Sequence, residues 1–107
     1  MPIHSHKDLI VWQKAIELSK KTYLLTEKFP KEEIYGITSQ MRRAVVSIPS
    51  NIAEGRSRGT RKDFIQFLRI SLGSASELET QIEIAKQLPD TKHLFYDEVE
   101  NLLSEVS

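Results

Sequence analysis

Residues 37–61, ITSQMRRAVVSIPSNIAEGRSRGTR, decide the fold predicted for this chain. Apolar and small residues recur in this stretch at intervals of three and four, the spacing that gathers side chains on one face of an α-helix. The opposite face carries small residues instead of the charges of an ordinary surface helix. We therefore expect a helix that is approached closely from two sides. The core-facing residues are Ile37, Met41, Ala44, Val45, Ile48, Ile52 and Gly55, and the small ones opposite are Ser39, Val46, Ser50 and Ala53.

Two residues of this helix affect its shape and its length. Pro49 lies within it and lacks a backbone donor, so a kink is expected there. Gly55 marks its end, and a turn that contains Gly59 and no acidic residue follows. The basic residues of this turn are Arg56, Arg58, Arg61 and Lys62.

Three further helices are predicted on either side of this one. The first covers about residues 7–28 and ends at Phe29-Pro30, because the residue before a proline resists the helical conformation. The third covers about 61–88, between the capping pair Thr60 and Asp63 and Pro89. The fourth covers about 92–107. With the helix at 37–55 these form one domain, residues 1–107, predicted to be an all-α, antiparallel, up-down-up-down four-helix bundle.

The composition excludes several classes of protein. The 107 residues include no cysteine, so disulfides and thiolate metal sites are excluded. The chain has no apolar run of about 18 residues and no charged-then-apolar leader, so we predict a cytoplasmic protein without a membrane span.

The net charge of zero conceals an asymmetry along the chain. Residues 1–89 contain fourteen Lys and Arg against ten Asp and Glu, whereas residues 90–107 contain one against five. The two segments therefore carry +4 and −4, which cancel. Because exposed charges act over about 8–10 Å at physiological salt, the basic turn can still attract an anion locally.

Long sequence matches indicate a family. The run SQMRRAVVSIPSNIAEG, with DLIVWQKA before it and DFIQFLRISLGSASELETQIEIA after it, resembles the bacterial four-helix-bundle family of 23S rRNA-intervening-sequence proteins. It is also similar to the accessory protein of diversity-generating retroelements. The resemblance implies a ring-shaped homopentamer of antiparallel bundles. The retroelement protein is basic and binds nucleic acid and a reverse transcriptase, so the resemblance makes RNA, DNA or such an enzyme possible partners.

No catalytic or metal-binding set stands out, and no cofactor is predicted. His4 and His6 form an HxH pair without the further ligands that a metal needs. Glu77 and Glu79 are close in sequence but point about 160° apart on a helix, so they cannot share a substrate. We therefore predict that the protein is not an enzyme.

Glu79 borders the apolar stripe of the third helix and needs a cationic partner there. Arg42 or Arg43 of the second helix is the candidate, which predicts a structural salt bridge in preference to a catalytic acid. Ser47 and Asn51 lie one turn apart and are expected to form hydrogen bonds that fix the helix register.

The basic turn is the candidate functional site. Arg61 and Lys62 occupy a helix start, where cations are mildly unfavourable for stability, so their presence there suggests an anionic ligand. A nucleic-acid phosphate is the simplest such ligand, and Arg56 and Arg58 would add to the site. The alternative is a solvated loop that aids solubility. The turn has no interleaved aromatic residues, so contacts with the backbone are expected rather than sequence-specific reading.

Two functions follow from these observations. The first is a homo-oligomeric bundle that binds nucleic acid as an accessory or scaffold protein in an RNA-linked process. The second is a ring that docks another protein and does not contact nucleic acid. The fourth helix is too short to cover the third, so either the chain continues beyond residue 107 or a neighbouring subunit covers the exposed seam.

Overall fold

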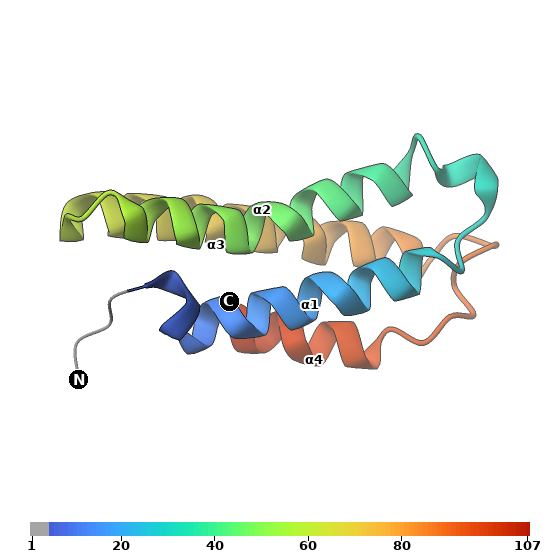
Figure 1. Cartoon of the computed structure of the whole chain (residues 1–107). Helices are drawn as coiled ribbons and strands as arrows, with labels where there is room; N and C mark the ends of the chain where they lie inside the picture. The colour runs from blue at the N-terminus through green and yellow to red at the C-terminus, as the bar shows by residue number, and fades with distance from the viewer. Residues whose placement is uncertain (1–4) are drawn as a thin grey trace.

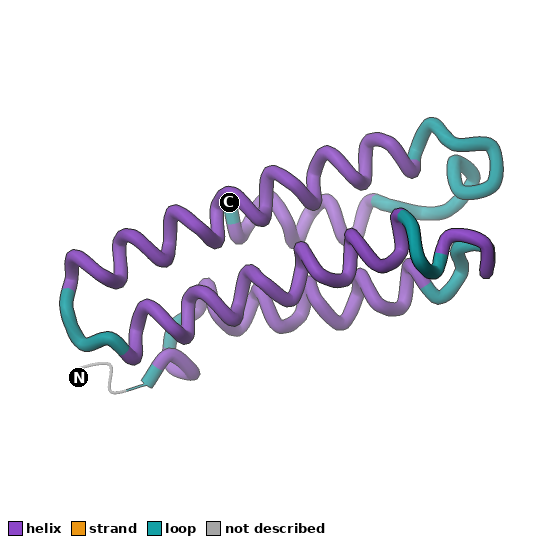
Figure 2. Tube along the Cα trace, turned by 90° about the horizontal axis from the view of Figure 1, so that it is seen from above, coloured by secondary structure: helices purple, strands orange, loops and turns teal. Residues whose placement is uncertain are grey.

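The computed structural model describes residues 5–107 and contains four α-helices, without a strand in that range. They are α1 (Ile10–Thr26), α2 (Ile37–Ser57), α3 (Arg61–Ala85) and α4 (Asp97–Val106), with short 3₁₀ helices η1 (His6–Asp8) and η2 (Lys31–Glu33). Figure 1 shows the long helices side by side, with α2 along α3 and α1 along α4. Successive helices run in opposite directions (Figures 1 and 2). The predicted all-α four-helix bundle is confirmed.

The core is aliphatic and receives side chains from all four helices. Its central residues are almost fully buried, and the stripe predicted for 37–55 supplies the largest share. Partly buried Leu9, Trp12, Phe64 and Leu68 pack against its ends. The core consists of Ala15, Leu18, Leu25, Phe29, Met41, Ala44, Val45, Ile48, Ile52, Ala75, Leu78, Ile82, Ala85, Tyr96, Val99, Leu103 and Val106.

Pro49 lies within α2, as the sequence predicts, and it cannot donate to the carbonyl of Val45. The hydroxyl of Ser19 on α1 lies 2.9 Å from the Ala15 carbonyl oxygen and 3.4 Å from that of Val45. A side chain of the neighbouring helix thus approaches the carbonyl that the proline leaves without its usual donor. On the other side of α2, Ser71 of α3 donates to the carbonyl of Ile48 over 3.0 Å.

A polar ladder joins α2 to α3. The hydroxyls of Ser47 and Ser74 are 2.9 Å apart, and Asn51 donates to the Ser47 hydroxyl over 2.9 Å and to its carbonyl over 2.8 Å. The predicted hydrogen bonding of Ser47 and Asn51 is confirmed. The Asn51 bonds lie within α2, whereas the Ser47–Ser74 bond crosses to α3 and, with the bond from Ser71 to the Ile48 carbonyl, favours one register of the two helices.

The observed helix bounds differ from the predicted ones mainly in α4. It begins at Asp97 rather than near residue 92. A helix that starts near residue 92 would use Asp90 or Thr91 as its N-cap, but the Thr91 hydroxyl forms a different hydrogen bond. The buried Thr91 hydroxyl donates to the carbonyl of Ala85 over 2.6 Å, and the Tyr96 hydroxyl donates to the carbonyl of Thr91 over 2.8 Å. Thr91 therefore supplies a hydrogen-bond donor to the last carbonyl of α3 instead of starting α4. Burial raises the pKa of Tyr96 above its ordinary value.

The first and third helices are also shorter than predicted. The chain enters α1 through η1, with the Ser5 hydroxyl accepting from the amide of Lys7, and α1 ends at Thr26. The Thr26 hydroxyl donates to the carbonyl of Thr22 over 2.9 Å. Helix α3 ends at Ala85. Helix ends carry weak sequence signals, so differences of a few residues are ordinary.

Candidate nucleic-acid interface

The basic turn lies at one end of the bundle, where α2 passes into α3. Gly59 adopts a φ of +83°, a left-handed conformation that favours glycine, and this reverses the chain. The Thr60 hydroxyl then accepts from the amide of Asp63 over 3.1 Å, which caps α3 as its sequence predicts. The tight connection leaves Arg61 and Lys62 in the exposed first turn of α3.

Arg58 is held by its neighbours on both helices. Its Nε lies 2.8 Å from a carboxylate oxygen of Glu54, and its guanidinium lies 5.1 Å from the ring centroid of Phe67. The carboxylate offsets part of its charge. Arg56 is half-buried on the last turn of α2. These two predicted residues flank the turn but are less available to a ligand than Arg61 and Lys62.

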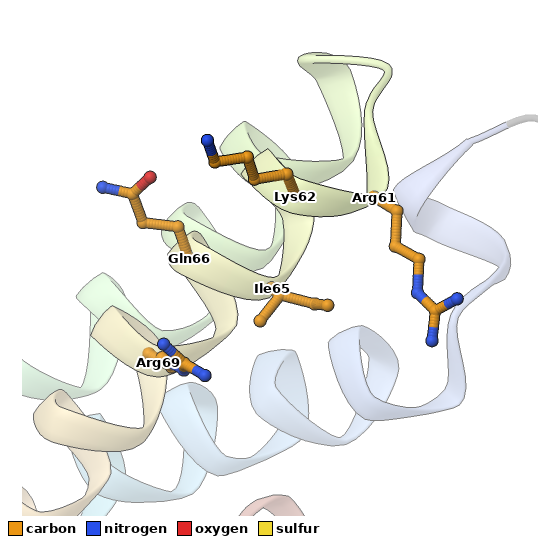
Figure 3. Close-up of a pocket in the computed structure, with 5 residues that line it drawn as sticks. All are labelled: Arg61, Lys62, Ile65, Gln66 and Arg69. Atoms are coloured by element: carbon orange, nitrogen blue, oxygen red, sulfur yellow. The ribbon is translucent and has the colours of Figure 1, made fainter.

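Arg61 and Lys62 line an open hollow of about 630 Å³ together with Ile65, Gln66 and Arg69 of α3. Figure 3 shows Ile65 pointing towards α1, whereas Lys62 and Gln66 point away from it. None of these five lining residues is acidic. Within residues 5–107, the side chains of Arg61, Lys62 and Arg69 form no ion pair or hydrogen bond. We call these three residues the α3 cationic cluster.

Arg69 is the member of this cluster that the sequence analysis missed as a site residue. It follows Lys62 by seven residues and Arg61 by eight, so two helical turns bring it to the same side of α3. A search for basic residues at helical spacing, rather than for adjacent ones in the turn, would have found it.

Three of the four acidic residues of α4 form ion pairs elsewhere in the bundle. Glu98 pairs with Lys21 at 2.8 Å, Glu105 with Lys14 at 2.9 Å and Glu100 with Lys86 at 3.1 Å. The hydrogen bond and charge of Glu98 raise the pKa of Lys21, and those of Glu100 raise the pKa of Lys86. The acidic C-terminal segment thus offsets lysines along the bundle and leaves the α3 cationic cluster unbalanced.

The predicted salt bridge between Glu79 and Arg42 or Arg43 is wrong for the residues that the structure describes. Arg42 donates to the hydroxyl of Thr26 over 2.9 Å, and its guanidinium lies 4.6 Å from the ring centroid of Tyr23. Arg43 donates to Ser39 over 3.3 Å on the surface of α2. Glu79 is exposed and lines a hollow beside α4, because it lies on the side of α3 that faces away from α2.

This placement changes what the loss of Glu79 should do. We expect Glu79→Ala to change the free energy of unfolding by less than about 0.5 kcal/mol, as at an ordinary surface position. Arg42→Ala is the contrasting variant, with an expected loss of about 1–2 kcal/mol, because it removes the contacts of Arg42 with Thr26 and Tyr23 of α1. Urea unfolding of the two variants measures the difference. A loss above 1 kcal/mol for Glu79→Ala would contradict the observed placement.

The other candidate sites give no ligand-binding geometry. His4 lies outside the described residues, and His6 makes an edge-on contact with Trp12 at 5.0 Å between ring centroids. Across residues 5–107, no three His, Asp or Glu side chains come together as a metal site would require. In the same range no helix has the length and apolar character needed to cross a membrane.

The comparisons with known proteins agree with this architecture. The family model described as 23S rRNA-intervening sequence protein matches residues 7–107, nearly the whole chain. The chain belongs to this family. The chain is similar to a crystal structure from Bacteroides thetaiotaomicron, which is described as that of a protein with unknown function from the S23 ribosomal protein family. The two share 24% identity and a TM-score of 0.73 over 91% of each chain, which shows a common fold. No protein with a curated description matches the sequence.

Proposed function

We propose that this protein is a non-enzymatic, nucleic-acid-associated bundle that binds phosphate backbones through the α3 cationic cluster. The observation that carries the proposal is that Arg61, Lys62 and Arg69 all line one open hollow that no acid lines. Arg56 and Arg58 flank this surface at the end of α2 and would extend it. The family name supports an RNA-linked role for its members.

The chemistry of the hollow favours the backbone over the bases. Exposed arginine and lysine side chains bind phosphate oxygens, and the first-turn amides of α3 add partial positive charge. None of its five lining residues is aromatic, so no platform for base stacking is present. Gln66 can donate a hydrogen bond to a sugar or phosphate oxygen. Binding should therefore depend little on nucleotide sequence.

Polarisation of labelled single-stranded RNA and duplex DNA tests this proposal. Replacing Arg61, Lys62 and Arg69 together with glutamine should weaken binding by at least about tenfold, because three phosphate contacts are lost. The variant should melt at or slightly above the wild-type temperature, since cations at a helix start are unfavourable.

The matched control replaces Lys28, Lys31 and Lys92 with glutamine. These exposed lysines belong to the segments between α1 and α2 and between α3 and α4, which lie at the opposite end of the bundle (Figure 1). Their removal changes the net charge by the same amount. The control should retain wild-type affinity. Equal loss of binding in both variants would indicate a non-specific charge effect, and no binding by the wild type at low salt would contradict the proposal.

We also propose that the chain assembles with copies of itself, with five subunits as the number that the family resemblance implies. Half-exposed apolar side chains of Tyr23, Ile34 and Val46 line a hollow on the outer side of α1 and α2, next to the small Ser39. Such a surface is suited to close approach by another subunit.

Sedimentation equilibrium measures the assembly directly. We expect a species several times heavier than the 12.3 kDa chain at micromolar concentration. Val46→Lys should shift it towards the monomer, because it adds a further positive charge beside Arg42 and Arg43, which line the same hollow. The substitution leaves all residues of the basic turn unchanged. A stable monomer for the wild type would contradict self-assembly without bearing on nucleic-acid binding.

A further inference from the structure

A hollow with polar walls lies between the first half of α2 and the second half of α3, which run side by side (Figure 1). It has a volume of about 380 Å³, and none of its lining residues belongs to the α3 cationic cluster. Each of these residues has a side chain that can form hydrogen bonds. We call it the α2–α3 polar hollow. It is lined by Tyr35, Ser39, Gln40, Arg43, Glu77 and Gln81.

Gln81 is the buried member of this set. Its exposed fraction is 6%, yet its Oε1 receives no hydrogen bond among residues 5–107. A buried amide oxygen without a donor costs free energy, and such groups almost always have a partner in folded proteins. Because the Gln81 side chain lines the hollow, an N–H or O–H group of a molecule that enters there would supply the missing donor.

Arg43 and Glu77 bring opposite charges to the same hollow from different helices. Within the described range they form no ion pair with each other, and the Glu77 carboxylate has no other partner. Arg43 donates to Ser39 over 3.3 Å, which leaves further N–H groups of its guanidinium available. The hollow can therefore accept an anionic group at Arg43 and a cationic group at Glu77.

This combination of residues selects among small ligands by their charge. An anion attracted by Arg43 would also meet the Glu77 carboxylate, and a cation attracted by Glu77 would also meet Arg43. A neutral apolar molecule would leave the Gln81 oxygen without a donor. A zwitterion that carries both an anionic group and N–H donors satisfies all three residues at once.

We propose that the α2–α3 polar hollow is a binding site for a free α-amino acid with a polar side chain. The carboxylate of the ligand would accept paired hydrogen bonds from Arg43, and its ammonium group would donate to Glu77 and to Gln81 Oε1. The hydroxyl of Ser39 and the amide of Gln40 would contact its side chain. The volume of the hollow lies at the lower end of the range of about 300–1,000 Å³ that small-molecule sites occupy.

NMR of the full 107-residue chain tests this proposal with L-serine, L-threonine, L-asparagine and L-glutamine, each added separately. At least one of them should give saturable shifts of the Glu77 and Gln81 signals, including the side-chain amide of Gln81. Two analogues of that amino acid serve as controls: the amine that lacks its carboxylate and the acid that lacks its ammonium group. Each should bind at least about tenfold more weakly, because hydrogen bonds between charged groups are lost.

Conservative substitutions on α3 identify the residues that hold the ammonium group. Glu77→Gln should weaken binding at least about tenfold and narrow the preference for the amino acid over its acid analogue. Glu79→Gln is the matched control, because it makes the same change on the same helix beside α4, and it should leave binding unchanged. Gln81→Met should also lose binding. Its melting temperature without ligand should stay at or above that of the wild type, since an unsatisfied buried oxygen is removed.

Several results would overturn the proposal. They are the absence of saturable shifts with all the amino acids tested, equal binding of either analogue, equal loss of binding in Glu77→Gln and Glu79→Gln, and unchanged binding by Gln81→Met, which would mean that a water completes the hydrogen bonding of Gln81. Ser39 and Arg43 also line the surface proposed for self-assembly, so sedimentation of the variants is measured as well. A lower mass for Gln81→Met would assign the hollow to a contact between copies. None of these results bears on nucleic-acid binding.

Discussion

Leu78→Ala is expected to lower the free energy of unfolding by about 2–5 kcal/mol, the range found for leucine truncations in a packed core. Leu78 is fully buried, with an exposed fraction of 0%, at the centre of the contact between α3 and the other helices. The methyl groups removed would leave a cavity that the rigid helices fill only partly. Urea unfolding followed by circular dichroism gives the value.

Leu72→Ala is the matched control, because the same residue type is changed on the same helix. Leu72 is 47% exposed, so its truncation should cost less than about 1 kcal/mol. Equal losses for the two variants would mean that Leu72 is covered in solution, by another copy or by chain beyond α4. A small loss for Leu78→Ala would contradict the observed core.

Gly55→Ala is the second substitution with a large expected effect. A Cβ at this position would lie 2.6 Å from the Cβ of Phe67 and 3.3 Å from the Cα of Phe64. Alanine normally stabilises a helix interior relative to glycine by about 1 kcal/mol, but here α2 and α3 would have to separate. We expect a net loss of about 1–3 kcal/mol, as for other overpacked sites.

Gly73→Ala makes the same chemical change, but it should alter the free energy of unfolding in the opposite direction. Gly73 lies on the exposed side of α3, and a Cβ built there meets no atom within 4 Å beyond its chain neighbours and the adjacent backbone of its own helix. It should raise the free energy of unfolding by about 0.5–1 kcal/mol through helix propensity alone. Thermal unfolding of both variants tests the contact between α2 and α3. Stabilisation by both substitutions would contradict the close approach at Gly55.

The sequence was sufficient to predict the bundle because the relevant signals are periodic and local. The stripe of 37–55 is buried as its spacing requires, and Thr60 caps α3 as expected. The predicted start of α4 is wrong because Thr91 resembles a helix N-cap, whereas its hydroxyl donates a hydrogen bond to the carbonyl of Ala85 across a turn. Nothing in the local sequence distinguishes these two uses of a threonine.

The candidate site was predictable in part, for a similar reason. Adjacent basic residues identified Arg61 and Lys62, but Arg69 joins them only through two turns of helix. The predicted salt bridge of Glu79 is wrong because the partner of this residue depends on how α3 is rotated about its axis. The observed rotation directs Glu79 towards α4 and leaves Arg42 against Tyr23 and Thr26 of α1. Such pairings depend on tertiary packing.

The division of charge along the chain connects these observations. Three glutamates of α4 pair with lysines of α1 and of the segment just after α3, so the acidic segment is held within the bundle. The arginines at the start of α3 have no such counterpart among residues 5–107. A neutral protein thereby presents a locally positive end, which is the physical basis of the proposed nucleic-acid binding.

The salt dependence of nucleic-acid affinity tests the central proposal most directly. Each phosphate neutralised by a cation contributes about −0.9 on duplex DNA, or about −0.7 on single strands, to the slope of log affinity against log salt. Replacing Arg61, Lys62 and Arg69 with glutamine should therefore flatten the slope by about 2–3 per bound subunit, while the Lys28, Lys31 and Lys92 control keeps the wild-type slope. A slope that is the same in the wild type and the α3 variant would contradict binding through the α3 cationic cluster.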